Sequence, residues 1–311
     1  MIVVASKNGR VGIAAAVDVL RRGGSAVDAV EAGIIPVESN PEDHSVGYSG
    51  YPNLIGEVEL DASIMDGLTL AAGAVGAIRG YEHPISIARK VMEELPHCFL
   101  VGTGAERFAK ELGFPTRDLL TEDARRVWHQ ILEEKAPEVY GQRMKYLDSI
   151  RRFVKITADP EKPNETVNFL AQDVKGNIAC GVSTSGWAWK YPGRLGDSPV
   201  IGAGNYADNR YGAAACTGRG EMAIRCATAR SIVLYMKMGL ALAEAGREAF
   251  RDLDALVDPF AGSMNAVALA PDGSHAAFSN MPEATYIYMT AEMGEPVEAA
   301  RIFVPPAKPL P

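Results

Sequence analysis

The chain has 311 residues, of which 47% are hydrophobic and 23% charged, and its formal net charge at pH 7 is -8. This composition is that of an ordinary globular protein, and the length suits one large domain or two small ones. The acidic balance argues against a nucleic acid or an anionic membrane as the main partner. No apolar run approaches the length of a membrane span, and residues 1–7 lack the features of a signal peptide, so we expect a cytoplasmic protein.

Helices and short strands alternate upstream of residue 136. Where apolar residues recur every three or four positions, the sequence predicts helices over 11–22, 26–33, 81–95, 105–112 and 121–135. Strands are expected over 1–7, in a hairpin of 57–65 with 68–75, and in a short buried segment over 97–101. Gly23-Gly24 ends the first helix, and Ser25 caps the second.

Two features of this first part were considered as ligand sites. A Gly- and Ser-rich passage over 43–53 is expected to be a loop whose backbone can approach a ligand closely, or else a solvent-exposed turn. Gly102-Thr-Gly104 lacks the remainder of a dinucleotide-binding motif and is interpreted as a strand-to-helix turn. The four cysteines and five histidines show no metal-binding spacing, so we expect buried free thiols and no zinc.

The composition changes between residues 136 and 165. Charges and turn formers such as Asp159-Pro160 and Lys162-Pro163 replace the helical period, which is typical of a mobile connector. Two interpretations remain open: a linker between domains, or the tail that is left when the chain is cut before Thr166.

Downstream of this connector the pattern becomes rich in strands. The expected strands are 166–173, 177–185, 213–217, 265–269, 275–279, 284–290 and 301–304. The first two form a hairpin, and a Gly- and Pro-rich loop over 191–209 follows them. Helices are expected over 221–238 and 241–251. Because no regular β-α-β repeat occurs, sheets covered by helices suit the pattern better than a doubly wound parallel sheet.

Thr166, at the start of the first downstream strand, is a candidate nucleophile. A threonine hydroxyl is a weak nucleophile that needs an adjacent base, and an N-terminal threonine supplies that base through its own α-amino group. Thr166 can therefore act only if the peptide bond from Glu165 is broken. The alternative is that Thr166 is an ordinary strand residue.

Further polar residues follow Thr166 within about fifty positions. Thr184, at the end of the paired strand, is expected beside Thr166 across the hairpin. Arg194 suits a carboxylate and Asp197 an ammonium, so together they describe a cradle for the head of a free α-amino acid. The alternative for these two is a surface ion pair. Thr217-Gly218 offers a hydroxyl and a backbone N–H to a developing oxyanion, or forms an ordinary turn.

Several spaced motifs of the chain resemble those of a known family. They are Thr166-Val, Gly176-Asn-Ile-Ala, Ser183-Thr184-Ser-Gly, Pro192-Gly-Arg194-Leu-Gly-Asp197, Gly202-Ala-Gly-Asn-Tyr-Ala-Asp208, Cys216-Thr217-Gly218-Arg-Gly-Glu and, upstream, Gly23-Gly24-Ser-Ala-Val-Asp28 and Glu59-Leu-Asp61-Ala-Ser-Ile-Met-Asp66-Gly. Together they resemble the glycosylasparaginase and plant-type asparaginase family of N-terminal nucleophile hydrolases over nearly the whole chain. The resemblance is strongest to the glycosylasparaginase branch.

The resemblance implies an α+β fold, built as a four-layer αββα sandwich, and autocleavage between Glu165 and Thr166. The products would be an α chain of residues 1–165 and a β chain of residues 166–311, which stay together as one domain. Members of the family are usually dimers of such αβ units.

The resemblance also implies a role for each candidate residue. Thr166 would be the nucleophile and, through its amine, the base, while Thr184 supports its hydroxyl. Arg194 and Asp197 would hold the α-carboxylate and α-amino groups of the substrate. Thr217-Gly218 would form the oxyanion hole. No cofactor and no metal are implied.

The implied reaction is hydrolysis of a side-chain amide through a β-aspartyl enzyme ester. We expect first an enzyme for N4-substituted asparagine of the glycosylasparagine type. The second expectation is a β-aspartyl (isoaspartyl) peptidase or L-asparaginase. The third, from a different class, is an uncleaved member that binds amino acids without catalysis.

Three positions depart from the family pattern. Glu165 precedes the nucleophile where glycosylasparaginases usually have Asp, and Asn168 stands where Gly is usual. Ser6-Lys7-Asn8 occupies the place of a Trp that glycosylasparaginases use near the sugar. Trp187 and Trp189 alternate along the chain after Thr184; we interpret them as core or interface residues rather than as a replacement aromatic wall.

Overall fold

The computed structural model describes residues 1–137, 145–153 and 166–307 of the chain. Its strands are β1 (Ile2–Ser6), β2 (Leu60–Asp66), β3 (Ala72–Ile78), β4 (Phe99–Val101), β5 (Val167–Gln172), β6 (Ile178–Thr184), β7 (Asn205–Asp208), β8 (Gly212–Gly218), β9 (Met264–Leu269), β10 (His275–Ser279), β11 (Thr285–Thr290), β12 (Val297–Ala300) and β13 (Ile302–Phe303). Its helices are η1 (Lys7–Val11, a 3-10 helix), α1 (Ile13–Arg21), α2 (Ala26–Glu38), α3 (Pro84–Glu94), α4 (Gly102–Glu111), α5 (Glu122–Lys135), α7 (Gly220–Cys226), α8 (Thr228–Lys237) and α9 (Leu242–Asp254).

The described strands form two sheets. The larger sheet has the order β12-β11-β1-β5-β6-β2-β3-β4, and the smaller has the order β13-β10-β9-β8-β7. Neighbouring strands are antiparallel except for the pairs β3–β4 and β10–β13. The expected hairpin at 166–185 is present as β5–β6, and that at 57–75 as β2–β3. This mixture of helices and mainly antiparallel sheets confirms the α+β class.

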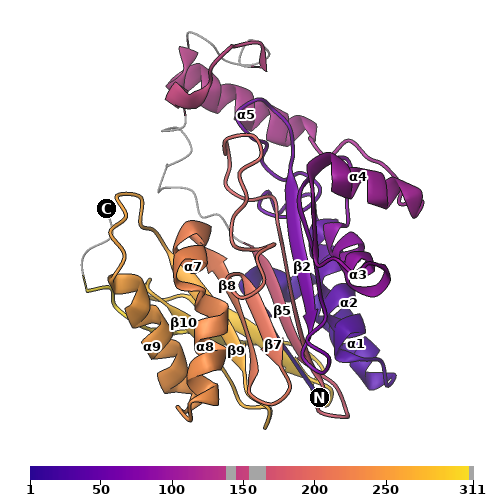
Figure 1. Ribbon diagram of the computed structural model, residues 1–311, viewed down its shortest axis with the longest axis vertical. Coiled ribbons are helices and arrows are strands. Elements are labelled where there is room, and N and C mark those ends of the chain that lie inside the picture. Colours follow the sequence, from indigo (N-terminus) through magenta and orange to yellow (C-terminus); the bar gives the residue numbers. More distant parts are fainter. Residues whose placement is uncertain (138–144, 154–165, 308–311) are drawn as a thin grey trace.

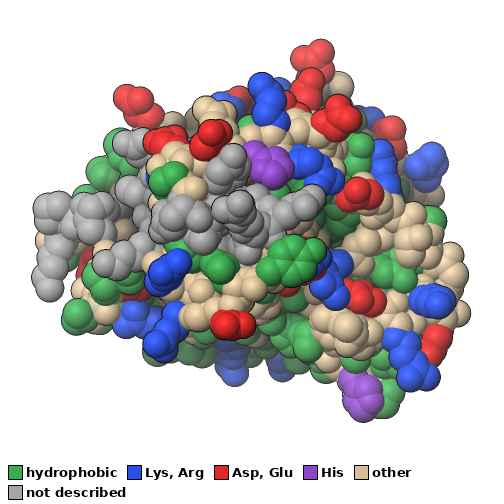
Figure 2. All heavy atoms as spheres, turned by 90° about the horizontal axis from the view of Figure 1, so that it is seen from above, with side chains coloured by type: hydrophobic (Ala, Val, Ile, Leu, Met, Phe, Trp, Pro, Cys, Tyr) green, Lys and Arg blue, Asp and Glu red, His purple; other side chains and the backbone are tan. Residues whose placement is uncertain are grey.

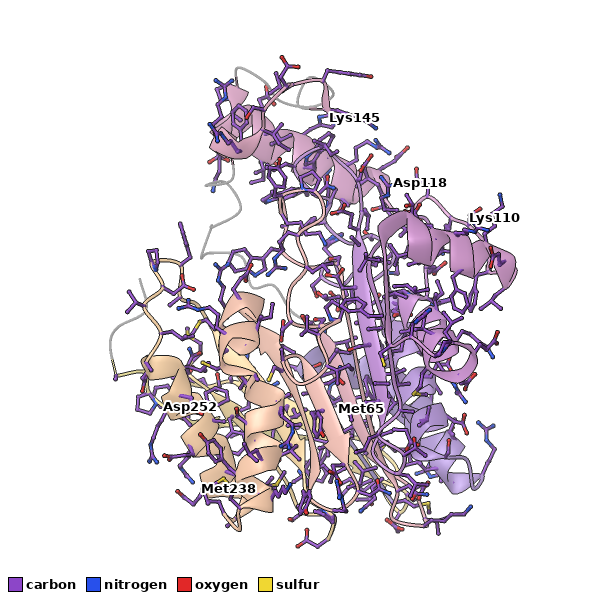
Figure 3. The ribbon with its side chains drawn as sticks, viewed as in Figure 1. Met65, Lys110, Asp118, Lys145, Met238 and Asp252 are labelled. Carbon is purple, nitrogen blue, oxygen red and sulfur yellow. The ribbon has the colours of Figure 1, made fainter. Side chains whose placement is uncertain are left out.

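The two sheets face each other across an apolar layer. Alternate residues of the central strands point into it, among them Leu170 of β5, Ala215 of β8 and Val267 of β9. Met65 of β2, labelled in Figure 3, belongs to the same layer, and its sulfur accepts a hydrogen bond from the backbone N–H of Ala207 of β7 at 3.4 Å. This contact joins β2 of the larger sheet to β7 of the smaller sheet.

Helices cover the outer face of each sheet, as Figure 1 shows. On the larger sheet α2 and α3 pack through residues such as Ile34 and Ile85. On the smaller sheet α8 and α9 pack through residues such as Phe250, which lies against Phe278 of β10. Asp252, labelled on α9 in Figure 3, accepts a hydrogen bond from the Tyr235 hydroxyl of α8 and so joins these two helices.

The helix expected over 221–238 is two helices in the structure. Ala227 has φ 47°, in the left-handed region that ends a right-handed helix, and separates α7 from α8. The N–H groups of Ala229 and Arg230 at the start of α8 donate to the carbonyls of Ala203 and Gly202, in the turn before β7. The break is therefore set by a tertiary contact that apolar periodicity does not reveal.

Other differences from expectation are local. Helix α2 begins at the Ser25 cap, as predicted, but continues through Pro36 to Glu38 rather than ending near Gly33. The expected buried strand at 97–101 is β4, an edge strand that pairs only with β3 among the described strands, so Phe99 and its neighbours are largely exposed. Cys98 beside it is exposed too, and β7 lies within the stretch expected to be a loop.

Part of the connector expected at 136–165 can be described. Ile150 and Phe153 are buried in a cluster with Trp128 of α5 and with Leu54. Residues 145–153 are thus anchored to the body of the protein, which differs from the mobile connector that we expected. Residues 138–144 and 154–165, including Glu165, lie outside the described residues.

Within the described residues, no helix has both the length and the apolar character needed to cross a bilayer. Acidic and basic side chains are intermixed over the described part of the face drawn in Figure 2. That part of the face therefore does not present a field of one sign.

Candidate active site

Four of the sequence candidates lie on strand ends at one edge of the facing sheets. Thr166 directly precedes β5, Thr184 ends β6, and Thr217-Gly218 ends β8. The β5–β6 ladder pairs Val167 with Ser183, so the next residues outward along it are Thr166 and Thr184. The expected position of Thr184 across the hairpin from Thr166 is therefore found.

The pleat directs the three hydroxyls into the space between the sheets. Leu170, Cys180 and Ala215 face the inner apolar layer, and residues an even number of positions away along the same strand point the same way. Those residues are Thr166 (7% exposed), Thr184 (4%) and Thr217 (5%).

The Thr184 hydroxyl is held by the loop that was expected to approach a ligand. It donates to the carbonyl of Ser45 at 3.2 Å and accepts from the N–H of Gly186 at 2.9 Å. The N–H of Ser185 donates to the same Ser45 carbonyl at 2.7 Å. These contacts give the hydroxyl a defined orientation at the end of β6.

Arg194 pairs with Glu221 and not with Asp197. Its Nε and Nη2 donate to the two carboxylate oxygens of Glu221 at 3.0 and 2.9 Å, a bidentate arrangement. Burial disfavours the charged form of Glu221, but the hydrogen bonds and charge of Arg194 prevail and hold the pKa of Glu221 below its usual value. The other edge of the Arg194 guanidinium, which carries Nη1, makes no hydrogen bond to Glu221 in this pair.

Asp197 is buried, and its Oδ2 has no hydrogen-bond partner among the described residues. Burial raises the pKa of this carboxyl to about 7. A Cβ on Gly220 would lie 2.7 Å from both the N and the Oδ1 of Asp197, so only glycine allows α7 to begin so close to it. A buried carboxylate oxygen without a partner is costly unless a ligand pairs with it.

Gly218 occupies a backbone position that only glycine fits. Its φ is 110°, and a Cβ would lie 2.2 Å from the carbonyl oxygen of Ser263. The next N–H, of Arg219, donates to that same carbonyl at 2.9 Å. The Thr217-Gly218 pair thus ends β8, and α7 begins two residues later at Gly220.

The sequence alone did not single out a set of charged residues around these candidates. Glu221 and Arg219 follow the oxyanion candidates, and Arg219 lies over the Trp187 ring with its Cζ 3.9 Å from the ring centroid. Arg194 lies against the same ring at 5.4 Å. Trp189, in contrast, is buried in the cluster around α5, as the core interpretation predicted. The only sequence signal for Glu221 was its place at the end of the Cys216–Glu221 motif.

A second missed group lies behind Thr184. Asp61 of β2 pairs with Thr184 in the β2–β6 ladder, and its Oδ2 is 4.0 Å from Nζ of Lys190. Lys190 is fully buried, donates to the Glu59 carbonyl at 3.0 Å, and has its pKa lowered by burial. Nothing in the local pattern of these residues distinguishes a buried pair from surface charges.

Asn168, the residue that replaces the usual glycine, joins three strands near Thr166. Its Oδ1 accepts from the N–H of Ser6 at 2.9 Å, and its own N–H donates to the Ser6 hydroxyl at 3.1 Å. Its Nδ2 donates to the carbonyl of Ala215 in the other sheet at 3.5 Å. The side chain is therefore a fixed link between β1, β5 and β8.

A cavity of about 230 Å³ adjoins Thr166 and Thr217. Ser6, the last residue of β1, and the next two residues, Lys7 and Asn8, line it. The other lining residues come from the β9, β10–β11 and β12–β13 regions and include Asn265, Glu283 and Arg301. Thr184, Arg194 and Asp197 do not line this cavity.

Comparison with known proteins gave consistent matches. Residues 6–297 match a family model described as asparaginase. The chain is 42% identical over 232 residues to the isoaspartyl peptidase/L-asparaginase of Mus musculus (74% of this chain, 65% of that protein). It is 39% identical over 240 residues to the N(4)-(beta-N-acetylglucosaminyl)-L-asparaginase of Elizabethkingia miricola (77% and 65%). It is 40% identical over 274 residues to the plant-type L-asparaginase of Pyrococcus abyssi (88% and 86%). The matched part spans slightly less than two-thirds of the first two relatives.

Proposed function

The chain belongs to the asparaginase family, and from that premise we propose that it is an autoprocessed amidohydrolase with Thr166 as its nucleophile. Its substrates are side-chain amides of asparagine derivatives that carry a free α-amino acid head. The observation that supports this best is the convergence of Thr166, Thr184 and Thr217 between the sheets, at one edge of the molecule.

The proposed reaction begins with cleavage of the bond between Glu165 and Thr166. The freed α-amino group, whose pKa is ordinarily about 8, accepts the hydroxyl proton of Thr166 as Oγ1 attacks the amide carbon. The Thr217 hydroxyl and the Gly218 N–H donate to the oxyanion that forms. The C–N bond then breaks, the leaving amine takes the proton, and water hydrolyses the β-aspartyl ester.

Head-group binding in this proposal uses Arg194 and Asp197. The substrate α-ammonium pairs with the Asp197 oxygen that has no partner among the described residues. The α-carboxylate binds the edge of Arg194 that Glu221 leaves open. Glu221 then acts as a positioning residue, because it holds the guanidinium in one orientation.

The proposal also covers the fold and the way the two chains would stay together after cleavage. We assign the two facing sheets with their outer helices to the four-layer αββα fold of N-terminal nucleophile hydrolases. The larger sheet takes β1–β4 from the proposed α chain of residues 1–165 and β5, β6, β11 and β12 from the β chain of residues 166–311. Interleaved strands would keep the two chains together after cleavage. Pairing of two αβ units into a dimer stays a prediction.

The leaving group has three candidates: a sugar amine, ammonia and an amino acid. The sequence resemblance placed the sugar amine of glycosylasparagine first. A β-aspartyl peptide is favoured by the cavity beside Thr166, because Lys7 and Arg301 line it and no aromatic side chain does so among the described residues. A leaving amino acid carries a carboxylate for these cations, whereas a neutral sugar does not.

Aspartate release tests the proposal. Purified protein is incubated with glycosyl-asparagine, a β-aspartyl dipeptide and L-asparagine side by side, with the Thr166→Ala variant as control. We expect release from at least one substrate by the wild type, and none by the variant. No release from any of the three would leave the non-catalytic, amino-acid-binding alternative.

A further inference from the structure

We infer that the cavity beside Thr166 is a leaving-group subsite in which Lys7 and Arg301 select a leaving amine that carries a carboxylate. The inference rests on the proposed function and deepens it, because it names residues that determine which amide is cleaved. It follows from where the cavity lies, how large it is and which charges line it.

The cavity and the head-group residues lie on opposite sides of Thr166. In the larger sheet, β5 stands between β1 and β6, with β2 beyond β6. The cavity is on the β1 side, at Ser6 and the residues after it. Asp197 is on the β2 side, since the carbonyl of the next residue accepts a hydrogen bond from the hydroxyl of Ser63 of β2. A substrate with its head at Asp197 and its amide at Thr166 therefore extends into the cavity.

The size of the cavity suits part of a substrate. Pockets that enclose a whole drug-sized ligand are about 300–1,000 Å³, and this one is about 230 Å³. The head group is bound elsewhere, so the space has to hold only what lies beyond the amide nitrogen. One small amino-acid residue is a leaving group of suitable size. Ammonia from asparagine would leave the cavity unused.

The two cations reach the cavity from separate parts of the chain. Arg301 is held rigidly, because its Nε donates to the Thr285 carbonyl at 2.8 Å and its Nη1 to the Ala266 carbonyl at 3.1 Å. Lys7 follows β1, the strand that pairs with β11, and its Nζ is 3.1 Å from Glu298 on the surface. Two cations among the lining residues favour an anion in the cavity.

Glu283 is the one carboxylate on the cavity wall within the described residues. Its φ of 60° is unusual for a residue other than glycine. The negative charge of Glu283 reduces the attraction of the two cations for a carboxylate. Removing the charge of Glu283 should therefore strengthen the preference for a leaving amine with a carboxylate. Removing the charge of Lys7 or of Arg301 should weaken that preference.

The experiment compares two substrates that differ in one charge. kcat/KM is measured for β-aspartyl-glycine and for β-aspartyl-glycinamide, which has nearly the same shape but lacks the carboxylate of the leaving glycine. We expect the wild type to prefer the acid about ten- to a hundredfold, as for a hydrogen bond to a charged group. Lys7→Gln and Arg301→Gln should each lower this acid-to-amide ratio, and Glu283→Gln should raise it. A loss of activity common to both substrates cancels in the ratio.

Arg10→Gln is the matched control. Arg10 also pairs with Glu298, at 2.8 Å, but does not line the cavity, so the ratio should stay at the wild-type value. If Arg301→Gln fails to fold, the exposed Lys7→Gln carries the test alone.

Equal kcat/KM for acid and amide in the wild type would overturn the subsite while leaving the amidohydrolase intact. The subsite would also be refuted if the wild type preferred the acid but none of the charge variants changed that preference. Faster hydrolysis of glycosyl-asparagine than of β-aspartyl-glycine would refute it too. Processed protein that hydrolyses none of these substrates, nor L-asparagine, would refute the proposed function and the subsite with it.

Discussion

At the scale of single residues, Asp197 shows how a binding group is kept at a cost in stability. Its carboxyl is buried and has a pKa of about 7, well above the value of about 3.9 in an unfolded chain. The folded protein therefore binds an extra proton between these two pH values, and folding is penalised as pH rises through this range. A substrate ammonium would offset that penalty by pairing with the ionised form.

Replacing Asp197 with Asn should separate stability from function. In a Thr166→Ala background, which keeps the chain whole, Asp197→Asn should raise the free energy of unfolding at pH 8 by roughly 1–3 kcal/mol. The gain in stability should shrink toward pH 4, because the Asp197 carboxyl of the folded parent is protonated there and, like the amide of the variant, carries no charge. Urea unfolding at the two pH values measures this change in the free energy of unfolding.

In the processed enzyme, Asp197→Asn should lower kcat/KM by at least about a hundredfold. A variant that is less stable at pH 8 than at pH 4, relative to its parent, would contradict the assignment.

Glu221 is expected to act through Arg194 rather than on the substrate. Glu221→Gln should raise KM about tenfold with kcat nearly unchanged, because the guanidinium loses a charged bidentate partner and its fixed orientation. Steady-state kinetics with L-asparagine or a β-aspartyl dipeptide measures the split. A fall in kcat at constant KM would show that Glu221 acts on the chemical step instead.

The sequence predicted the positions of some site residues but not the partners or the burial of others. Thr166, Thr184 and Thr217 could be placed because each begins or ends a strand that the sequence predicts. Arg194 and Asp197 were named, but the partner of Arg194 was not, because the bidentate pair spans 27 positions with no periodic relation. Buried charges such as Lys190 look in sequence like surface charges, and only their packing distinguishes them.

At the scale of elements, the break between α7 and α8 is the clearest case of tertiary contact overriding local preference. Apolar periodicity runs through 221–238 without a glycine or proline near the break. The carbonyls of Gly202 and Ala203 instead take the first N–H groups of α8, and Ala227 adopts the left-handed region as a result. The hairpins were predictable because their turns are short and carry Asp-Gly or Lys-Gly.

Ala227→Gly tests this account of the break. Glycine adopts φ 47° without the cost of about 1–2 kcal/mol that other residues bear, so the variant should be as stable as its parent or up to about 1 kcal/mol more stable. Ala32→Gly, in the middle of α2, is the matched control and should lose about 1 kcal/mol. Both are measured by urea unfolding in the Thr166→Ala background. Equal losses at the two positions would mean that Ala227 is not strained.

At the scale of the whole molecule, the order of strands could not be read from the sequence. β1 pairs with β11, so Ile2 lies opposite Thr290, and it pairs on its other side with β5. Such pairings depend on surfaces brought together from the two ends of the chain, which local periodicity does not encode. The class of fold was predictable only because the strands are many and short, without β-α-β repeats.

The same strand order bears on the proposed cleavage. β5 begins one residue after Thr166 and is hydrogen-bonded to β1 on one side and β6 on the other. A cut at Glu165–Thr166 would therefore free the amine of Thr166 without detaching the strand that follows it. Activity and chain cleavage should appear together, because the uncut Thr166 has no base.

Mass spectrometry of the denatured, purified protein tests this central claim most directly. We expect two polypeptides, residues 1–165 and 166–311, that elute together before denaturation, and a single 311-residue chain for Thr166→Ala. Aspartate release should rise in proportion to the fraction of chains that begin at Thr166. A wild type that stays whole yet hydrolyses β-aspartyl substrates, or that is cut at another bond, would contradict the account.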